Sequence, residues 1–249
     1  LPVDSEHNAI FQVFESKNRD SIEKIILTAS GGPFRTHTID QMAMMTPEQA
    51  LDHPTWDMGA KISIDSATMM NKALEVIEAQ RLFDMKPKQI DVLVHPQSLI
   101  HSMVQYEDGS LLAQMGAADM CTPITYALGY PNRLPSPGDK LDLTQLRQLD
   151  FEPVDRERFP FVQTAYDCLE SGLASCITMN AANEVAVEAF LNHKIAFLDI
   201  YNLVLDMLSK CESRPLNSLK EILSYDSFVR RQANSCILKI TSQPQRATS

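Results

Sequence analysis

The chain has 249 residues, of which 44% are apolar, and a formal net charge of −10 at pH 7. This length is enough to bury one large core or two smaller ones, and the acidic balance argues against nucleic acid or an anionic membrane as a partner. No apolar run approaches the roughly 18 residues of a membrane span. Five cysteines without a C-x-x-C pair favour free thiols in a reducing compartment.

The first sixty residues predict short helices around one buried strand. Asp4 or Ser5 can cap a helix that runs to about Phe14. The segments that follow are a β-branched strand at Lys24–Thr28, a Gly-rich loop at 30–34, a capping box with Pro at the first helical position at 46–49, and an irregular loop with the only Trp at 53–59.

The segment 64–80 predicts an amphipathic helix that begins near Ser66. An apolar stripe recurs at helical spacing and consists of Met70, Leu74 and Ile77. A polar set falls on the opposite side and consists of Asn71, Lys72 and Glu75. Such a surface suits a phosphorylated, oxygen-rich small molecule and a hard metal ion. The alternative is an ordinary amphipathic helix with a solvated polar face.

The middle of the chain predicts more strands, and its end predicts only helices. The run Ile90–His95 predicts a buried strand, Leu99–Tyr106 and Ser110–Met115 a hairpin, and 122–130 a short helix. Proline-rich residues 131–158 predict a long ordered connection. Five helices are expected after it, at Phe161–Glu170, Ile177–Asn192, Phe197–Lys210, Ser218–Leu223 and Ser227–Ile240, before a frayed tail at 241–249.

These elements predict an α+β fold: a central mixed-sheet domain followed by an all-α helical bundle. The expected boundaries are residues 1–130 for a metal- and substrate-binding catalytic domain, 131–158 for the extended connection and 159–249 for the C-terminal helical domain. The N-terminal sequence LPVDSEHN lacks an initiator Met and the features of a signal peptide. We therefore expect the chain to be part of something longer.

Three carboxylates form the candidate metal site. Asp4 and Glu6 begin a predicted helix, where acidic residues commonly do no more than complement the helix dipole. Together with Glu75 they would make a hard oxygen set suited to Mg²⁺ or Mn²⁺. The sequence does not establish that these three residues converge.

Two loops are candidate ligand sites. Ser30, Gly31 and Gly32 follow a strand, where backbone N–H groups and a hydroxyl can approach a phosphate, although a plain turn has the same sequence. His53 shares a loop with Trp56 and Met58, and this loop is either a lid over a ligand or a segment whose Trp fills a surface groove. No G-x-G-x-x-G or P-loop motif is present.

Six motifs together resemble one family. In chain order they are LPVDSEHNAIFQ, SGGPFR, HP-x-W-x-MG, KISIDSATMMNKALE, HPQSLIHSMV and NAANEVAVEAFL. The sequence is similar to the 1-deoxy-D-xylulose 5-phosphate reductoisomerase family over nearly the whole chain. The resemblance implies an oxidoreductase that uses NADPH and Mg²⁺ or Mn²⁺ to convert 1-deoxy-D-xylulose 5-phosphate into 2-C-methyl-D-erythritol 4-phosphate, on the non-mevalonate route to isoprenoids.

The resemblance also implies roles for individual residues. Asp4, Glu6 and Glu75 match the metal ligands, and with Lys72 they form the catalytic set. Substrate contacts are implied for Ser5, Ser30, His53, Trp56, Met58, Ser66, Asn71, Lys72 and His95. His53, Trp56 and Met58 lie in the family's flexible lid. Contacts with the NADPH cofactor are implied for Gly59 and Met120.

The family's NADPH domain precedes the point where this sequence begins, so we expect little or no turnover by the 249-residue chain alone. Further expectations are a homodimer, paired through the strands after residue 90, and a location in the bacterial cytoplasm or a plastid-type organelle. Two rivals stay open: another divalent-metal-dependent sugar-phosphate isomerase or aldolase, and an inactive oligomerisation or binding module.

Overall fold

The structure is a computed structural model that describes residues 1–56 and 58–242. These residues form two compact units that interleave along the chain. Unit 1 comprises Leu1–Gly32, Pro54–Asp57 and Glu75–Asp155, and unit 2 comprises Pro33–His53, Met58–Leu74 and Arg156–Ser249. The division predicted from the sequence follows chain order, whereas the compact units place residues 33–53 and 58–74 with the C-terminal helices.

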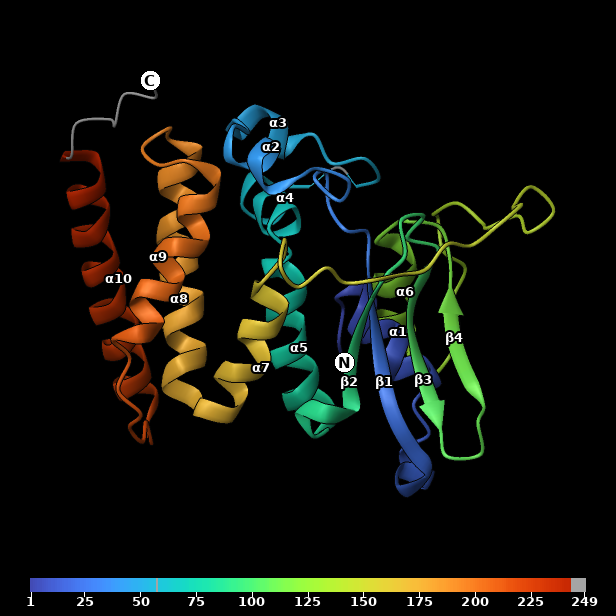
Figure 1. The fold of residues 1–249 in the computed structure, drawn as a ribbon. Coiled ribbons are helices and arrows are strands. Elements are labelled where there is room, and N and C mark those ends of the chain that lie inside the picture. Colours follow the sequence, from blue (N-terminus) through green and yellow to red (C-terminus); the bar gives the residue numbers. More distant parts are fainter. Residues whose placement is uncertain (57, 243–249) are drawn as a thin grey trace. The chain divides into compact units, whose positions relative to one another are not determined.

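Unit 1 is built on a mixed five-stranded sheet with the strand order β4-β3-β1-β2-β5 (Figure 1). The strands are β1 (Ile22–Ala29), β2 (Ile90–Val94), β3 (Ile100–Tyr106), β4 (Leu111–Met115) and β5 (Glu152–Pro153). β1 pairs in parallel with β2, and all other pairs are antiparallel. The predicted hairpin between β3 and β4 is confirmed, with Gly109 at a φ of 86° that favours glycine.

The connection predicted at 131–158 differs from the structure in one respect. Within it, β5 pairs with the end of β2, so the segment adds the fifth strand to the sheet. Glu152 and Pro153 thereby gain backbone partners in the sheet, whereas Asn132, Gln145 and Leu146 donate backbone hydrogen bonds within local turns.

Helices cover the sheet of unit 1. α1 (Ser5–Val13) lies against β3 and β4, with Ala9 and Ile10 fully buried (Figure 1). α6 (Cys121–Gly129) contacts α1, and the 3₁₀ turns η1 (Ser16–Ser21) and η2 (Pro87–Gln89) precede β1 and β2. The start of α1 is fixed by Asp4, which caps the helix as predicted by accepting hydrogen bonds from the backbone N–H groups of Glu6 and His7.

The prediction of one helix starting near Ser66 is wrong. The structure has α4 (Ala60–Ala67) and α5 (Met70–Phe83), separated at Met69, whose φ of 61° is left-handed. The fully buried residues of α5 are Met70, Ala73, Val76 and Ala79, and the predicted stripe residues Leu74 and Ile77 are only half-buried. The alternative of a solvated polar face is also wrong, because the residues Lys72 and Glu75 are 4% and 2% exposed.

Unit 2 is helical throughout. Its other helices are α2 (Ile39–Ala43), α3 (Pro47–Leu51), α7 (Phe161–Ser171), α8 (Leu173–Leu191), α9 (Phe197–Ser209) and α10 (Leu219–Ser242). α9 and α10 both pack on α8, and the predicted capping box at Thr46 and Gln49 is confirmed (Figure 1). The two helices predicted after residue 217 are one continuous helix, α10, and most of the predicted frayed tail lies outside the described residues.

α8 is the central helix of unit 2, and the NAANE motif lies in its middle. Ala181, Ala182 and Asn183 are fully buried, while Glu184 pairs with Arg230 of α10 at 2.9 Å. Small side chains therefore let neighbouring helices approach, and the polar ones connect α8 to them. Over the described residues, none of the helices is both long enough and apolar enough to cross a lipid bilayer.

Candidate metal and substrate site

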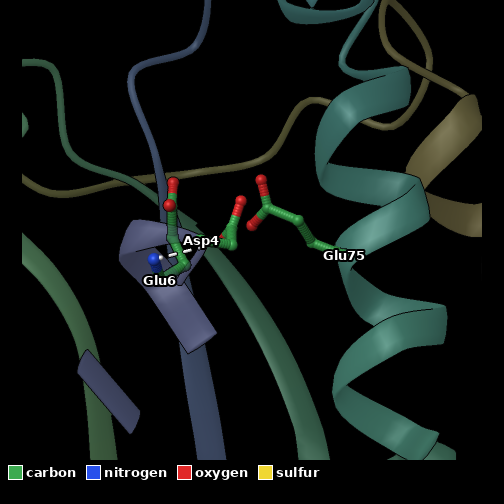
Figure 2. Close-up of side chains that lie close together, drawn as sticks. All are labelled: Asp4, Glu6 and Glu75. Carbon is green, nitrogen blue, oxygen red and sulfur yellow. Dashed lines mark hydrogen bonds between the residues drawn. The ribbon is translucent and has the colours of Figure 1, made fainter. Parts of the chain in front are cut away.

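The structure brings three carboxylates of unit 1 together. Asp4 and Glu6 lie at the start of α1, Glu75 projects from α5, and all three carboxylates point into the same space (Figure 2). One carboxylate oxygen from each residue lies within 4.8 Å of those of the other two. Residues about seventy positions apart in the sequence therefore offer three oxygens at a single point.

The spacing of these oxygens suits a small divalent cation. Three points no more than 4.8 Å apart share a centre that is within about 2.8 Å of each, which is 4.8 Å divided by √3. Mg²⁺ binds oxygen at about 2.0–2.1 Å and prefers carboxylates together with water and substrate oxygens. Side-chain movements of less than an ångström would therefore close the set around such an ion.

His7 connects the two halves of this cluster, although no role was predicted for it from the sequence. Its Nδ1 lies 3.0 Å from a carboxylate oxygen of Asp4, and its Nε2 lies 3.1 Å from the backbone carbonyl oxygen of Glu75. Both partners are acceptors, so both ring nitrogens must donate, which requires the charged imidazolium. Burial of this side chain lowers the pKa of His7, but the hydrogen bonds to Asp4 and to the Glu75 carbonyl and the charges of Asp4 and Glu78 together outweigh it, so the pKa is raised.

The spacing Asp-x-x-His at a helix start predicts the contact of His7 with Asp4, but not its contact with the Glu75 carbonyl. A residue three positions after a helix cap returns to the same face as the cap. Ser5, between Asp4 and Glu6, donates its hydroxyl to the Glu6 carboxylate and is 9% exposed. The segment 4–7 therefore supplies two carboxylates together with one neighbouring donor for each of them.

The predicted phosphate residues are distributed over both units. Ser66 is half-buried in the last turn of α4, and Asn71 and Lys72 lie in the first turn of α5, all within unit 2. Ser30 follows β1 in unit 1, and its hydroxyl accepts a hydrogen bond of 3.1 Å from the backbone N–H of Gly32. Gly31 and Gly32 are buried and both have positive φ, a conformation that favours glycine.

The predicted lid residues lie on the loop between α3 and α4. Trp56 is half-buried and its ring meets that of His101 edge-on at 6.4 Å. His53 and Met58 are also half-buried, and burial lowers the pKa of His53. Residue 57 of the predicted lid lies outside the described residues.

His95 is fully buried directly after β2. Its Nδ1 lies 2.8 Å from the backbone carbonyl oxygen of Asp150, and its ring stacks on Phe151 at 4.9 Å. The ring therefore has no exposed atom for the predicted substrate contact in this structure. His101, which the sequence did not single out, is the histidine next to Trp56, and its Nε2 lies 3.2 Å from the carbonyl oxygen of Ala117.

Two family models match most of this chain. The 1-deoxy-D-xylulose 5-phosphate reductoisomerase C-terminal domain matches residues 1–83, and the DXP reductoisomerase C-terminal domain matches residues 115–232. The chain belongs to the 1-deoxy-D-xylulose 5-phosphate reductoisomerase family. The family predicted from the sequence motifs is therefore confirmed, as are the α+β class and the helical C-terminal region.

Relatives in this family are similar throughout the chain. The 1-deoxy-D-xylulose 5-phosphate reductoisomerase of Zymomonas mobilis is 55% identical over 94% of this chain, and that of Rhodospirillum centenum is 54% identical over 95%. A solved reductoisomerase from Zymomonas mobilis in complex with NADPH superposes with a TM-score of 0.90 at 53% identity and covers 95% of this chain. A solved reductoisomerase in complex with NADPH, fosmidomycin and magnesium gives a TM-score of 0.93 at 44% identity over 98%.

The chain spans about 60% of the length of these curated reductoisomerases, 60% of the Zymomonas mobilis protein and 59% of the Rhodospirillum centenum protein. It spans 61% and 64% of the two solved chains. The two residues predicted to contact the reductoisomerase cofactor lie in different units: Gly59 at the start of α4 in unit 2, and Met120, 37% exposed, at the start of α6 in unit 1.

Proposed function

We propose that this chain supplies the metal- and substrate-binding residues of an NADPH-dependent reductoisomerase that converts 1-deoxy-D-xylulose 5-phosphate into 2-C-methyl-D-erythritol 4-phosphate. The observation that carries the proposal is the convergence of Asp4, Glu6 and Glu75 within 4.8 Å, in a chain that belongs to this family. The reaction rearranges carbon–carbon bonds beside a carbonyl and then reduces the rearranged intermediate. It therefore needs a site that holds several substrate oxygens at once.

Asp4, Glu6 and Glu75 would hold Mg²⁺ or Mn²⁺, since three carboxylates are the hard oxygen donors that these ions prefer. When bound, such an ion polarises the substrate's carbonyl and stabilises negative charge on its oxygens. The protein's part is to fix the donors. Asp4 is anchored by its helix cap and by His7, and His7 also holds the backbone at Glu75.

Substrate binding is assigned to the polar residues that the family resemblance implies. Ser30, Ser66, Asn71 and Lys72 would hold the phosphate end, with Lys72 also available to donate to substrate oxygens or support proton transfer. Ser5 would contact the substrate beside the metal ligands. A phosphate bound away from the reacting carbons supplies binding energy for orientation and for closing the loop of His53, Trp56 and Met58. Excluding water in this way protects reactive intermediates.

NADPH is the proposed hydride donor, and both of the similar solved reductoisomerases described above are complexes with NADPH. Gly59 and Met120 are the proposed contacts within this chain. At Gly59 a side chain would meet no atom within 4 Å, so open space borders this backbone position. Met120 is partly exposed at the start of α6.

A homodimer in the cytoplasm is the proposed state of the protein. β4 is an edge strand of the sheet, and its residues Leu111 and Leu112 are 51% and 40% exposed. An edge strand with exposed apolar side chains can pair with another chain. Unit 1 also exposes Ile124 and Leu128 on α6, and these apolar side chains are further candidates for the interface.

The experiment that tests the site is calorimetric titration of the chain with fosmidomycin, a phosphonate hydroxamate found in one of the similar solved reductoisomerases. We expect binding in the presence of Mn²⁺ and none in the presence of EDTA, because the hydroxamate needs the metal. Ser66→Ala should weaken binding at least tenfold by removing a donor to the phosphonate.

The matched control is Ser235→Ala in α10, where an exposed serine donates to the backbone carbonyl of Arg231 within its own helix. This variant should bind fosmidomycin with the wild-type dissociation constant. Binding that ignores EDTA, or that is lost equally in both serine variants, would contradict the proposed site.

A further inference from the structure

A second buried carboxylate lies outside the metal cluster, in unit 2. Asp65 in α4 is 1% exposed and has two side-chain partners. The side-chain N–H of Asn183 in α8 donates to one carboxylate oxygen at 2.9 Å, and the ammonium of Lys61, one turn earlier in α4, lies 2.5 Å from the other. Residue 183 belongs to the NAANE motif, which the proposed function leaves without a role.

The contact between Asp65 and Asn183 joins α4 and α8 through buried polar groups, and burying such groups costs free energy of desolvation. Burial raises the pKa of Asp65 even though Lys61 and Asn183 favour its charged form, so the carboxylate is not fully compensated. The side-chain oxygen of Asn183 is buried and, among the described residues, has no hydrogen-bond partner. An apolar contact of the same size would stabilise the helix packing more. A directional contact retained at such a cost is explained by the orientation that it fixes.

The helix that carries Asp65 is held by tertiary contacts, which include the fully buried Ile64 and Ala67. α4 has eight residues, too few to be stable alone, and Gly59 at its start offers no side-chain cap. Successive residues of a helix differ by about 100° around its axis. Holding Asp65 against α8 therefore determines the direction in which the next residue, Ser66, points.

The orientation extends past the end of α4. The Thr68 hydroxyl donates to the backbone carbonyls of Ile64 and Asp65 at 3.2 and 3.3 Å, which closes the last turn. Met69 then adopts a left-handed φ of 61°, an unfavourable conformation for a residue with a Cβ, and α5 begins at Met70. Because this turn is short and has one defined conformation, the direction of α4 also determines the positions of Asn71 and Lys72 in the first turn of α5.

We propose that Asp65 and Asn183 form a positioning lock, in which α8 sets the rotation of α4 and thereby aims Ser66, Asn71 and Lys72 at the phosphate of the substrate. The inference rests on the proposed function, because it takes those three residues as the phosphate site. It gives the C-terminal helical unit a role in substrate affinity, although neither Asp65 nor Asn183 needs to touch the substrate.

The test is a pair reversal read out by two ligands. Asn183→Asp places two carboxylates against each other and should weaken fosmidomycin binding in the presence of Mn²⁺ at least tenfold. The double variant Asp65→Asn with Asn183→Asp restores a carboxylate–amide pair and should recover the affinity to within about threefold of wild type. Mn²⁺ affinity without fosmidomycin should stay within twofold in all variants, because Asp4 and Glu6 lie at the start of α1 and His7 holds the backbone of Glu75 through a hydrogen bond to its carbonyl oxygen.

The matched control is Thr178→Val, also in α8. Thr178 is buried and interacts with Ala174 of its own helix and with Tyr225 of α10, so its loss lowers stability without touching α4. This variant should bind fosmidomycin like wild type. Should Asn183→Asp fail to fold, Asp65→Asn, which keeps the volume of the side chain, takes its place and should also weaken binding.

The outcomes separate the two proposals. Loss of fosmidomycin binding with intact Mn²⁺ binding and recovery in the double variant supports the lock. Wild-type fosmidomycin affinity in a folded Asn183→Asp chain, or equal weakening by Thr178→Val, overturns it. A wild-type chain that binds Mn²⁺ but no fosmidomycin overturns the proposed phosphate site itself, and the lock with it.

Discussion

Replacing Glu75 by Gln keeps the shape of the side chain and removes one of three negative charges. A cation at the common centre of the three oxygens would lie within about 2.8 Å of Glu75, from the 4.8 Å spacing. A double positive and a single negative charge at that separation attract by about 3 kcal/mol even at the dielectric constant of water. Glu75 is 2% exposed, so the effective dielectric is lower and this is a lower limit. We therefore expect Mn²⁺ affinity to fall at least 100-fold.

Thermal unfolding with and without Mn²⁺ measures this change. At 100 times the dissociation constant the wild-type chain gains about 2.7 kcal/mol, which for a chain of this size raises Tm by roughly 5–11 °C. The same Mn²⁺ concentration would stabilise Glu75→Gln by about 0.4 kcal/mol, or roughly 1 °C.

Glu107→Gln is the charge-matched control, since Glu107 is exposed in the β3–β4 hairpin, away from the cluster. It should keep the full Mn²⁺ shift. Without metal, Glu75→Gln also relieves repulsion of about 1 kcal/mol per carboxylate pair at the dielectric constant of water, so the substitution itself should not unfold the protein. A folded Glu75→Gln chain with Mn²⁺ affinity within threefold of wild type would refute the metal site.

Three further predictions concern titration and packing. Burial holds the pKa of Asp65 above its ordinary 3.8, so the folded chain binds this proton more tightly than the unfolded chain, and the carboxyl's contribution to stability is lost as the pH rises through the folded pKa. Urea unfolding between pH 4 and 7 should therefore show that wild type loses stability relative to Asp65→Asn. Parallel curves for the two proteins would argue against this. Burial raises the pKa of the Cys168 thiol from 9.0 to about 12, so iodoacetamide should alkylate it at pH 8 about 1,000-fold more slowly in the folded chain than in the urea-unfolded chain. Mass spectrometry of the labelled peptides measures these rates. A difference under tenfold would be inconsistent with the prediction. Leu27→Ala, at a fully buried position of β1, should lower the free energy of unfolding by about 2–5 kcal/mol. Leu82→Ala, at a 56% exposed position, should change it by less than about 0.5 kcal/mol. Equal effects of the two substitutions in chemical denaturation would show that burial does not determine the loss of stability.

The elements with strong local signals were predictable from the sequence. The cap at Asp4, the capping box at Thr46 and Gln49 and the turn at Gly109 all appear where predicted. Each depends on hydrogen bonds or φ values within a few residues, so a short window of sequence contains the information.

The errors arose where distant contacts decide the local conformation. Met69 breaks the predicted helix with a left-handed φ, yet no Gly or Pro marks the position. β5 forms because it pairs with β2, from which it is separated by more than fifty residues. Lys72 and Glu75 carry side chains that are normally exposed, and only the folded chain shows that they are buried.

The candidate site was predictable in composition but not in geometry. Asp4, Glu6 and Glu75 could be chosen as ligand types, and the family resemblance joined them, but their approach to within 4.8 Å depends on how α1 and α5 pack in unit 1. His7 was missed because its importance depends on a backbone carbonyl 68 residues away. A backbone acceptor leaves no trace in the amino-acid sequence.

The interleaving of the two units has a consequence for protein synthesis and for truncating mutations. The ribosome synthesises α4 early, but its partner helix α8 begins only at Leu173. Asp65 of the nascent chain therefore has no contact with Asn183 until α8 has been synthesised. A chain that stops after residue 155 would contain all the strands of unit 1 that the structure describes, but its α4 would lack α8, the helix that orients it. Late nonsense mutations should therefore damage residues encoded far upstream, and neither unit can be expressed by cutting the gene once.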